Sequence, residues 1–592
     1  MSFLQSHLVN LVIFAPLLFA AIVAALPQTE KQQIRVATLF GMAVTLLLAL
    51  WLYLCFEPNG PEFQFEYRAR WIAALGISFH TGVDGLAVSL MMLTALLGPL
   101  VVLASWSFIE ERVKEFHLAL LLLQTAMLGA FASLDLVLFY VFWEAMLIPM
   151  YFIIGVWGSE ERVMAAVKFF LFTMVGSLLM LVAILALYFI SQPAGARSFD
   201  YAQIYNSLLS ATREVSACAR AGGVCSGLSP LAHNLWIYGP WMFFAFAIAF
   251  AVKVPMFPVH TWLPDAHVQA PAAGSIILAG VMLKMGTFGF WRYAIPLFPV
   301  AVRESTPLLA ALSIVGIVYG ALMCLAQRDV KRLIAYSSVS HLGFCMLGMI
   351  AITEEGAAGS AYQMLNHGIS TGALFLLFGM LYERRHVRLI AEYGGIAKVM
   401  PLFSALFLII TFSSIAVPGT NGFVGEFLVL LGTFKSALPR FFGVLAALGV
   451  ILGPAYMLWM VQRVFFGPLT HSENQRVRDL NLRELATALP LVALAILMGV
   501  LPQPFLSRLA PATKLFVARA SLGADAASDD LRNLEMKVLD LPPEAALSSR
   551  PDTPARFFGQ PRRANGAASS LSSSAAADNL STAHTRAFEL HR

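Results

Sequence analysis

Six ionisable side chains lie inside long apolar stretches of this chain, and their types could carry chemistry. An ionisable group in hydrocarbon is costly unless it is paired or hydrated, so function is the first interpretation of its presence there. Carboxylates, lysines and histidines all bind and release protons, so each of these residues is a candidate functional site. The six residues are Glu144, Lys253, Lys284, His341, His367 and Glu426.

Glu144 and Lys253 are a lone acid and a lone base in the middle of separate apolar stretches, which suits mutual charge balance. If such a pair separates, the lysine loses its counter-charge and tends to release its proton. The alternative is a buried ion pair that only fixes helix packing. For Lys284 the alternative is an ammonium that reaches toward the membrane surface along its apolar stem.

The two histidines lie in adjacent apolar stretches. Each of them could be an ordinary buried residue whose hydrogen bonds are satisfied. Two histidines on two helices could also ligate a haem. Only one such pair occurs in the apolar stretches, however, and a quinone cytochrome usually needs more.

Proline interrupts two apolar stretches close to these residues. Pro255 and Pro258 follow Lys253, and Pro418 begins a Gly-rich segment just before Glu426. Proline removes helix hydrogen bonds, and such breaks persist at membrane depth only where they face protein or a wet cavity. In transporters, paired breaks in two halves of the chain mark the ion path. The two breaks lie five spans apart, which predicts two halves of inverted orientation.

The overall composition indicates which class of protein carries these six residues. Of the 592 residues, 59% are hydrophobic and 12% are charged, whereas a soluble domain has roughly 45–50% and about 25%. This excludes a soluble enzyme, a disordered regulator and a nucleic-acid binder. Five cysteines without a Cys-x-x-Cys motif exclude a disulfide scaffold, a zinc ribbon and a usual iron–sulfur site. The usual nucleotide-binding motifs are missing as well.

The apolar residues fall in blocks of about 18–25, the length that spans roughly 30 Å of hydrocarbon. The sequence therefore predicts an all-α polytopic membrane protein with about 14 transmembrane helices, two of them broken, in two inverted five-helix repeats. The blocks lie near residues 7–26, 34–56, 84–108, 116–133, 135–157, 164–192, 240–259, 270–296, 307–326, 332–352, 361–382, 401–434, 443–466 and 484–507.

This pattern predicts five parts along the chain. Three N-terminal helices lie in residues 1–115. The first repeat, helices 4–8, covers residues 116–296, and the second repeat, helices 9–13, covers residues 307–466. The last helix lies at 484–507, and residues 520–592 are polar and rich in Ser and Ala, which predicts a disordered tail.

Further features of the sequence predict which segments lie outside the membrane. Residues 57–83 alternate in polarity and predict a strand or hairpin outside the membrane. The outside loop 193–239 contains Cys218 and Cys225, which could form a disulfide or remain two thiols. The loops of one side hold about twice as many Lys and Arg as the others, which predicts that both termini lie outside. No Lys or Arg precedes Lys31, so the first block is expected to be a retained helix with its N-terminus outside.

Around these residues the sequence resembles the proton-pumping antiporter-type subunits of respiratory NADH:quinone oxidoreductase. The resemblance covers roughly residues 1–510, and its longest specific segment is FAVKVPMFPVHTWLPDAHVQAPAAGSIILAGVMLKMGTFG (250–289). The acid at position 426 favours the M-type branch, related to mitochondrial NADH dehydrogenase subunit 4, over the L- and N-type subunits, which carry lysine there. Further matching segments are GVDGLAVSLMMLT (82–94), FWEAMLIPMYFIIGVWG (142–158), KRLIAYSSVSHLGF (331–344), NHGISTGALFLLFGMLYERR (366–385), YGGIAKVMP (393–401) and VPGTNGFVGEF (417–427).

The resemblance implies one role for each of the six residues along a polar axis. Glu144 matches the acid of an ion pair, Lys253 matches the lysine on the first broken helix, and Lys284 matches a connecting lysine. The two histidines match the central residues of the axis. Glu426 matches the terminal acid on the second broken helix.

The resemblance also implies a function. The chain would be a proton-translocating subunit of the complex in a bacterial inner membrane, without catalytic activity of its own. It would hold no prosthetic group, while NADH, FMN, iron–sulfur clusters and quinone would bind partner subunits. Its neighbours would be L- and N-type subunits. The alternatives are a subunit of a multi-subunit cation/proton antiporter, a membrane-arm subunit of an energy-converting hydrogenase, or a structural spacer.

Overall fold

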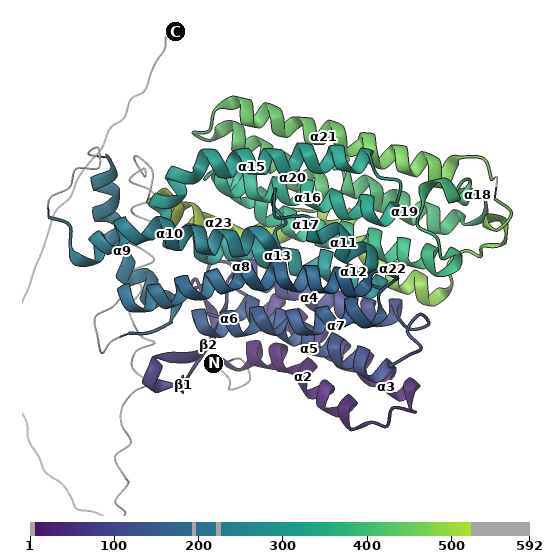
Figure 1. The fold of residues 1–592 in the computed structure, drawn as a ribbon, viewed down its shortest axis with the longest axis horizontal. Coiled ribbons are helices and arrows are strands. Elements are labelled where there is room, and N and C mark those ends of the chain that lie inside the picture. The colour runs from purple at the N-terminus through teal and green to yellow at the C-terminus, as the bar shows by residue number, and fades with distance from the viewer. Residues whose placement is uncertain (1–5, 192–196, 221–226, 470, 523–592) are drawn as a thin grey trace, which may run out of the picture. The chain divides into compact units, whose positions relative to one another are not determined.

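The structure, a computed structural model, describes residues 6–191, 197–220, 227–469 and 471–522 of the chain. Within these residues the protein is a bundle of long helices with one β-hairpin (Figure 1). Thirteen of the helical segments are long and apolar enough to cross a membrane. The prediction of an all-α polytopic membrane protein is therefore confirmed.

The crossing helices follow the predicted apolar blocks, and a further crossing is made of two short helices, α19 (Pro401–Ser414) and α20 (Asn421–Lys435). In the first half the crossings are α2 (Leu8–Ala25), α3 (Lys31–Cys55), α4 (Gly85–Ala104), α5 (Val113–Ala132), α6 (Leu136–Ala145) with α7 (Leu147–Trp157), α8 (Arg162–Ile190) and α10 (Pro230–Lys253). In the second half they are the segment Ala272–Leu297, α15 (Pro299–Leu325), α16 (Val330–Ile350), α17 (Glu354–Arg385), α21 (Arg440–Val461) and α22 (Leu482–Val500).

Aspartate side chains fix where several of these helices begin. The carboxylate of Asp84 accepts the backbone N–H of Ala87 at the start of α4. Asp135 accepts the N–H groups of Val137 and Leu138 at the start of α6. A carboxylate at this position satisfies donors that the first turn leaves open, and it interacts favourably with the helix dipole. The cap on α6 thereby sets the start of the helix that carries the first predicted acid.

The first predicted break is present between α10 and α11 (Trp262–Gln269). Residues 254–261 leave the helical path because proline at 255 and 258 cannot donate a backbone hydrogen bond. Lys253 is the last residue of α10, directly before this break, and its place in the middle of a span stays a prediction. The helix begins at Pro230 rather than near residue 240.

The second predicted break, residues 415–420, separates α19 from α20. Gly419 adopts a φ of +93° there, which glycine reaches without strain. The two half-helices approach closely, since a Cβ on Gly422 would lie only 2.1 Å from the carbonyl oxygen of Ser413. Glu426 therefore lies near the start of a half-helix that is packed tightly against the preceding one.

The segment Ala272–Leu297 is only partly α-helical. Two π-helical turns, Leu278–Met282 and Phe290–Ala294, separate its pieces α12 (Ala272–Ile277), α13 (Leu283–Gly289) and α14 (Ile295–Leu297). Turns of this kind occur frequently at functional sites. Lys284 lies between the two turns, in a segment that other helices bury completely.

The outer segments contain more regular structure than the sequence predicted. The expected hairpin in residues 57–83 is present as β1 (Gln64–Ile72) and β2 (Ile77–Val83), which pair antiparallel. The expected loop 193–239 instead contains the helix α9 (Tyr201–Arg220) and the first residues of α10. Cys218 in α9 is disulfide-bonded, and Cys225 lies outside the described residues.

The end of the described chain also differs from the prediction. The last crossing ends at Val500, not near residue 507, and a further helix, α23 (Gln503–Ser521), follows it. This helix is tied to the segment before the hairpin because the Arg519 guanidinium donates to both oxygens of Glu62, at 2.6 and 2.8 Å. Of the predicted tail 520–592, residues 523–592 lie outside the described residues.

The helices that carry the predicted residues pack against one another. In Figure 1, α16, α17 and α20 lie together, and α17 contacts both of the others. Within the described chain, α17 and the segment Ala272–Leu297 are the most deeply buried crossings. Four of the predicted residues, Lys284, His341, His367 and Glu426, therefore lie in a well-covered part of the bundle. The division into two inverted five-helix repeats, residues 116–296 and 307–466, stays a prediction.

Candidate functional site

Glu426 and His341 are in direct contact in the second half of the bundle. Nδ1 of His341 lies 3.0 Å from Oε1 of Glu426. The same carboxylate oxygen accepts a hydrogen bond from Nε2 of Gln363 at 3.1 Å. On the other edge of the imidazole, the Ser414 hydroxyl lies 3.4 Å from Nε2. If the Ser414 hydroxyl is the donor to Nε2, then Nδ1 of His341 carries the ring hydrogen and donates a hydrogen bond to the Glu426 carboxylate.

Lys284 and His367 form the second contact. The lysine ammonium lies 2.6 Å from Nδ1 of His367 and also donates to the carbonyl oxygen of Ala279. Ala279 belongs to the π-turn before α13, which brings its carbonyl within reach of the residue five positions later. Because an ammonium can only donate, Nδ1 of His367 accepts and its Nε2 carries the proton. That Nε2 is buried and has no hydrogen-bond partner.

The two contacts are joined through the histidines. The ring centroids of His341 and His367 lie 5.8 Å apart. Lys284, His367, His341 and Glu426 thus form a row across α13, α17, α16 and α20, and all four side chains are buried. Each group can hold a proton, and each lies next to another that can take it. We call these four residues the polar row.

The sequence did not reveal the polar residues that support the row. Nδ2 of Asn366 donates to Oε1 of Gln363 at 3.1 Å and to the carbonyl oxygen of Asn421 at 2.8 Å. The hydroxyl of Ser370 on α17 lies 2.5 Å from that of Ser413. Gln363, Asn366 and Ser370 recur at helical spacing beside His367, and this polar face of an otherwise apolar helix was the available signal.

Lys253 lies outside the polar row, at the end of α10. Its ammonium is buried and has no hydrogen-bond partner. It lies over two aromatic rings, 5.3 Å from the centroid of Trp143 and 5.5 Å from that of Phe169. Lys284 is on a neighbouring helix, and the helices meet where Gly286 approaches the carbonyl oxygen of Phe250. The ring partners of Lys253 carried no signal in the sequence beyond their apolar character.

The structure does not bring Glu144 and Lys253 into contact. Glu144 is half-buried at the end of α6, and its buried oxygen Oε1 has no hydrogen-bond partner. No salt bridge joins it to Lys253 in this structure. The carboxylate still acts electrostatically on the ammonium. The expected ion pair is therefore open in this arrangement.

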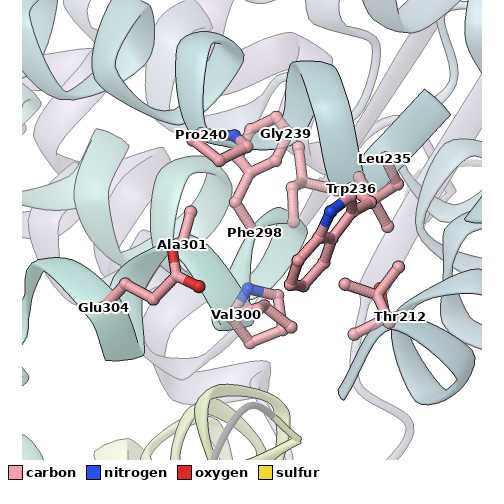
Figure 2. Close-up of a pocket in the computed structure, with 12 residues that line it drawn as sticks. Thr212, Leu235, Trp236, Gly239, Pro240, Phe298, Val300, Ala301 and Glu304 are labelled. Carbon is pink, nitrogen blue, oxygen red and sulfur yellow. The ribbon is translucent and has the colours of Figure 1, made fainter. Parts of the chain in front are cut away.

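Two cavities open at opposite ends of the bundle. One, of about 280 Å³, lies between α9, α10 and α15 and is lined by Trp236 and Glu304 among others (Figure 2). It contains none of the six predicted residues. The other, of about 290 Å³, lies on the side whose loops are rich in Lys and Arg and is lined by Lys331, Glu383 and Phe375 among others.

The second cavity comes close to His267, a histidine that is not among the six predicted residues. His267 is fully buried, neither of its ring nitrogens has a hydrogen-bond partner, and its ring stacks on Phe375 at 4.5 Å. Lys331 and Lys284 are the cations that act on it electrostatically. Among the described residues, no group of three or more His, Cys, Asp or Glu side chains is arranged to hold a metal ion.

Comparison with known proteins identifies the family. Residues 133–453 match the family described as the transmembrane proteins of NADH:quinone oxidoreductases and Mrp antiporters. NADH-quinone oxidoreductase subunit M of Rhodobacter capsulatus is 44% identical over 84% of this chain and 94% of its own length. NADH-ubiquinone oxidoreductase chain 4 of Marchantia polymorpha is 40% identical over 83% of this chain and 94% of its own.

The solved structures agree. A chain of respiratory complex I from Thermus thermophilus superposes with a TM-score of 0.74 at 34% identity, covering 86% of this chain and 99% of that one. A chain of the Mrp complex from Dietzia shares the fold, with a TM-score of 0.72 at 19% identity over 90% of this chain and 99% of that one. The chain therefore belongs to the antiporter-like membrane subunits of NADH:quinone oxidoreductase, in the subunit M group.

Proposed function

We propose that this chain moves protons across the membrane within a respiratory NADH:quinone oxidoreductase, and that the polar row is the central part of the path. The supporting observation is the row of neighbouring titratable side chains from Lys284 through the two histidines to Glu426. Electron transfer from NADH to quinone takes place in other subunits. This subunit contributes proton translocation and has no catalytic activity of its own.

The energy requirement is compatible with such a row. Moving one charge against 100 mV costs about 2.3 kcal/mol. One pKa unit is worth about 1.36 kcal/mol, so a change of about two units at a site of the row drives one proton across. Conformational or electrostatic coupling from the redox subunits supplies that change. Lys253 and Glu144 are well placed to receive it, because their ion pair is open here and closing it moves charge at the end of α10, which contacts the helix of Lys284.

Access to the row from the two sides differs. The cavity beside Lys331 lies on the side that the positive-inside rule assigns to the cytoplasm. It supplies water toward His267 and Lys284. At the other end, Glu426 lies beyond a helix break, where freed backbone groups favour water. Protons therefore enter near Lys284 and leave near Glu426.

The partners follow from the same reasoning. Glu144 is half-buried on a chain that belongs to a multi-subunit family. A half-buried acid at membrane depth suits the contact with a neighbouring subunit, and we infer that L- and N-type subunits lie on either side. NADH, FMN, iron–sulfur clusters and quinone bind elsewhere in the complex. The membrane is the bacterial inner membrane, with both termini on the outside.

The test is a Lys284→Gln variant in the intact complex. We expect the complex to assemble and to oxidise NADH with an artificial acceptor at the normal rate. NADH-driven proton pumping in sealed vesicles is expected to fall to a small fraction of wild type, because the amide cannot carry a proton to His367. The matched control is Lys435→Gln, at the outer end of α20, where the lysine pairs with Glu355. Normal pumping by Lys284→Gln would contradict the proposal.

A further inference from the structure

The surroundings of Lys253 are unusual for a buried cation. Its ammonium is buried by protein, contacts no carboxylate and donates no hydrogen bond in this structure. A buried charge without a partner is strongly disfavoured. The ring faces of Trp143 and Phe169 lie close to it, with centroids at 5.3 and 5.5 Å. Both distances are within the range of cation–π attraction.

The two rings are held in place by their own packing. The ring of Phe169 lies 5.3 Å from that of Trp262, whose indole N–H donates to the carbonyl oxygen of Val252 at 2.9 Å. Val252, the residue directly before Lys253, thus holds Trp262, and Trp262 in turn holds the Phe169 ring. The ring of Trp143 lies 5.5 Å from that of Phe250, one turn earlier on α10. The rings and the lysine therefore keep their geometry as one unit.

The same helix offers Lys253 two different partners. Trp143 and Glu144 are adjacent at the end of α6, so they point in directions about 100° apart on the helix. Trp143 is fully buried and faces the ammonium, whereas Glu144 is half-buried and out of contact. An ammonium near the end of α6 can be stabilised by the ring face or by the carboxylate, and this structure has the first arrangement.

We propose that Trp143 and Phe169 are positioning residues for Lys253, forming an aromatic cage that retains its proton while the Glu144 carboxylate is out of contact. The cage keeps the lysine charged during the open state of the pair. This inference rests on the proposed function, because it assigns the cage a part in the same proton path.

The test compares proton pumping against pH in the intact complex, reconstituted in sealed vesicles. We expect Trp143→Leu and Phe169→Leu to lose pumping at a lower pH than wild type, with the alkaline limb shifted by about one pH unit, or ~1.4 kcal/mol. The direction follows because loss of the ring face disfavours the charged lysine. Trp143→Phe, which keeps a weaker ring face, is expected to shift less. Phe407→Leu, a buried ring that packs on Phe465 instead, is the control and keeps the wild-type profile.

A second set of variants separates electrostatics from packing. Fluorinated tryptophans placed at Trp143 alone keep the ring's shape while withdrawing charge from its face. We expect the shift to grow with the number of fluorines, which a purely structural role would not produce. Wild-type pH profiles in Trp143→Leu and Phe169→Leu, or no trend with fluorination, would overturn the cage. Lys253→Ala distinguishes the two levels: normal pumping there contradicts the proposed function itself, while lost pumping with unshifted cage variants contradicts only the cage.

Discussion

Glu426 shares one carboxylate oxygen between side chains from two helices, His341 on α16 and Gln363 on α17. Such a shared acceptor fixes where a proton can arrive at the end of the row. At this scale the chemistry depends on single atoms. The free Nε2 of His367 is the one place in the row where a water or a rotated ring is needed to complete the transfer to His341.

Replacing Glu426 tests the terminal position directly. We expect Glu426→Ala to lose most NADH-driven pumping in sealed vesicles, whereas Glu426→Lys keeps part of it because a lysine still carries a proton. The change leaves the buried donors of His341 and Gln363 without their acceptor, at about 1–3 kcal/mol each, and we expect the complex still to assemble. Glu355→Ala, which removes a surface ion pair, is the control. Equal pumping by Glu426→Ala and wild type would place the terminal site elsewhere, with His367 the next candidate.

At the scale of elements, one histidine joins the outer hairpin to the helix α9. Nδ1 of His80 on β2 lies 2.6 Å from Asp200, directly before α9, and its Nε2 lies 3.1 Å from Glu66 on β1. The Arg68 guanidinium lies 3.5 Å from the same Asp200 carboxylate. The helix α9, which the sequence analysis placed in a loop, is therefore anchored to the hairpin by charge.

The stability of this anchor depends on pH. Burial lowers the pKa of His80, but the Asp200 and Glu66 carboxylates outweigh it and raise the pKa to about 9 from an ordinary 6.5. Because the folded value is the higher one, the charged histidine contributes on the order of 3 kcal/mol. That contribution is complete below about pH 6.5 and is lost as the pH rises through about 9.

Hydrogen exchange of residues 64–83 measures this contribution. After correction for the intrinsic exchange rate, we expect protection of the hairpin to fall between about pH 6.5 and pH 9. His80→Gln should show weaker protection at neutral pH and little change across the same range. Constant protection in wild type would show that the anchor does not depend on the charge of His80.

At the scale of the whole molecule, the described chain ends with α23, which closes back onto an outer segment near its beginning. Arg519 donates a hydrogen bond to Glu62, although the two residues are more than four hundred positions apart in the sequence. Its guanidinium also lies 4.4 Å from the ring centroid of Tyr205 on α9. The last helix thus ties together the hairpin region and the outer helix.

Truncation separates the last helix from the residues after it. We expect a chain cut after Leu522 to assemble and pump normally. The residues that this cut removes, 523–592, have too few large apolar side chains to bury a core. A chain cut after Pro502, which also lacks α23, should lose most of its assembly into the complex, because Glu62 loses its partner. Blue-native gels and vesicle pumping measure both effects. Failure of the longer chain to assemble would make residues 523–592 a docking element.

How much of this could be predicted differs from residue to residue. Glu426 and Lys284 could be recognised because a titratable group within twenty apolar residues is costly and therefore rarely accidental. Gln363, Trp143 and Phe169 could not be singled out in the same way. Amides and aromatic rings are tolerated at many buried positions, so their types alone carry little information about contacts.

The sequence by itself determined the class of molecule and the residues that can carry a proton. Hydropathy and proline positions act locally, through the solvation of each segment and its own hydrogen bonds, so they can be evaluated without knowing the fold. They predicted the crossings, both breaks and the hairpin. They failed for α9 and α23, whose apolar residues are too few for a crossing and become buried only against other helices.

Only the tertiary structure decided which of these residues meet. The row from Lys284 to Glu426 joins side chains that are up to 142 positions apart, and the open arrangement of Glu144 and Lys253 depends on the direction in which the end of α6 faces. Contacts of this kind follow from how helix faces pack. Their energies depend on distances of a few ångströms, which neither composition nor spacing along the chain can specify.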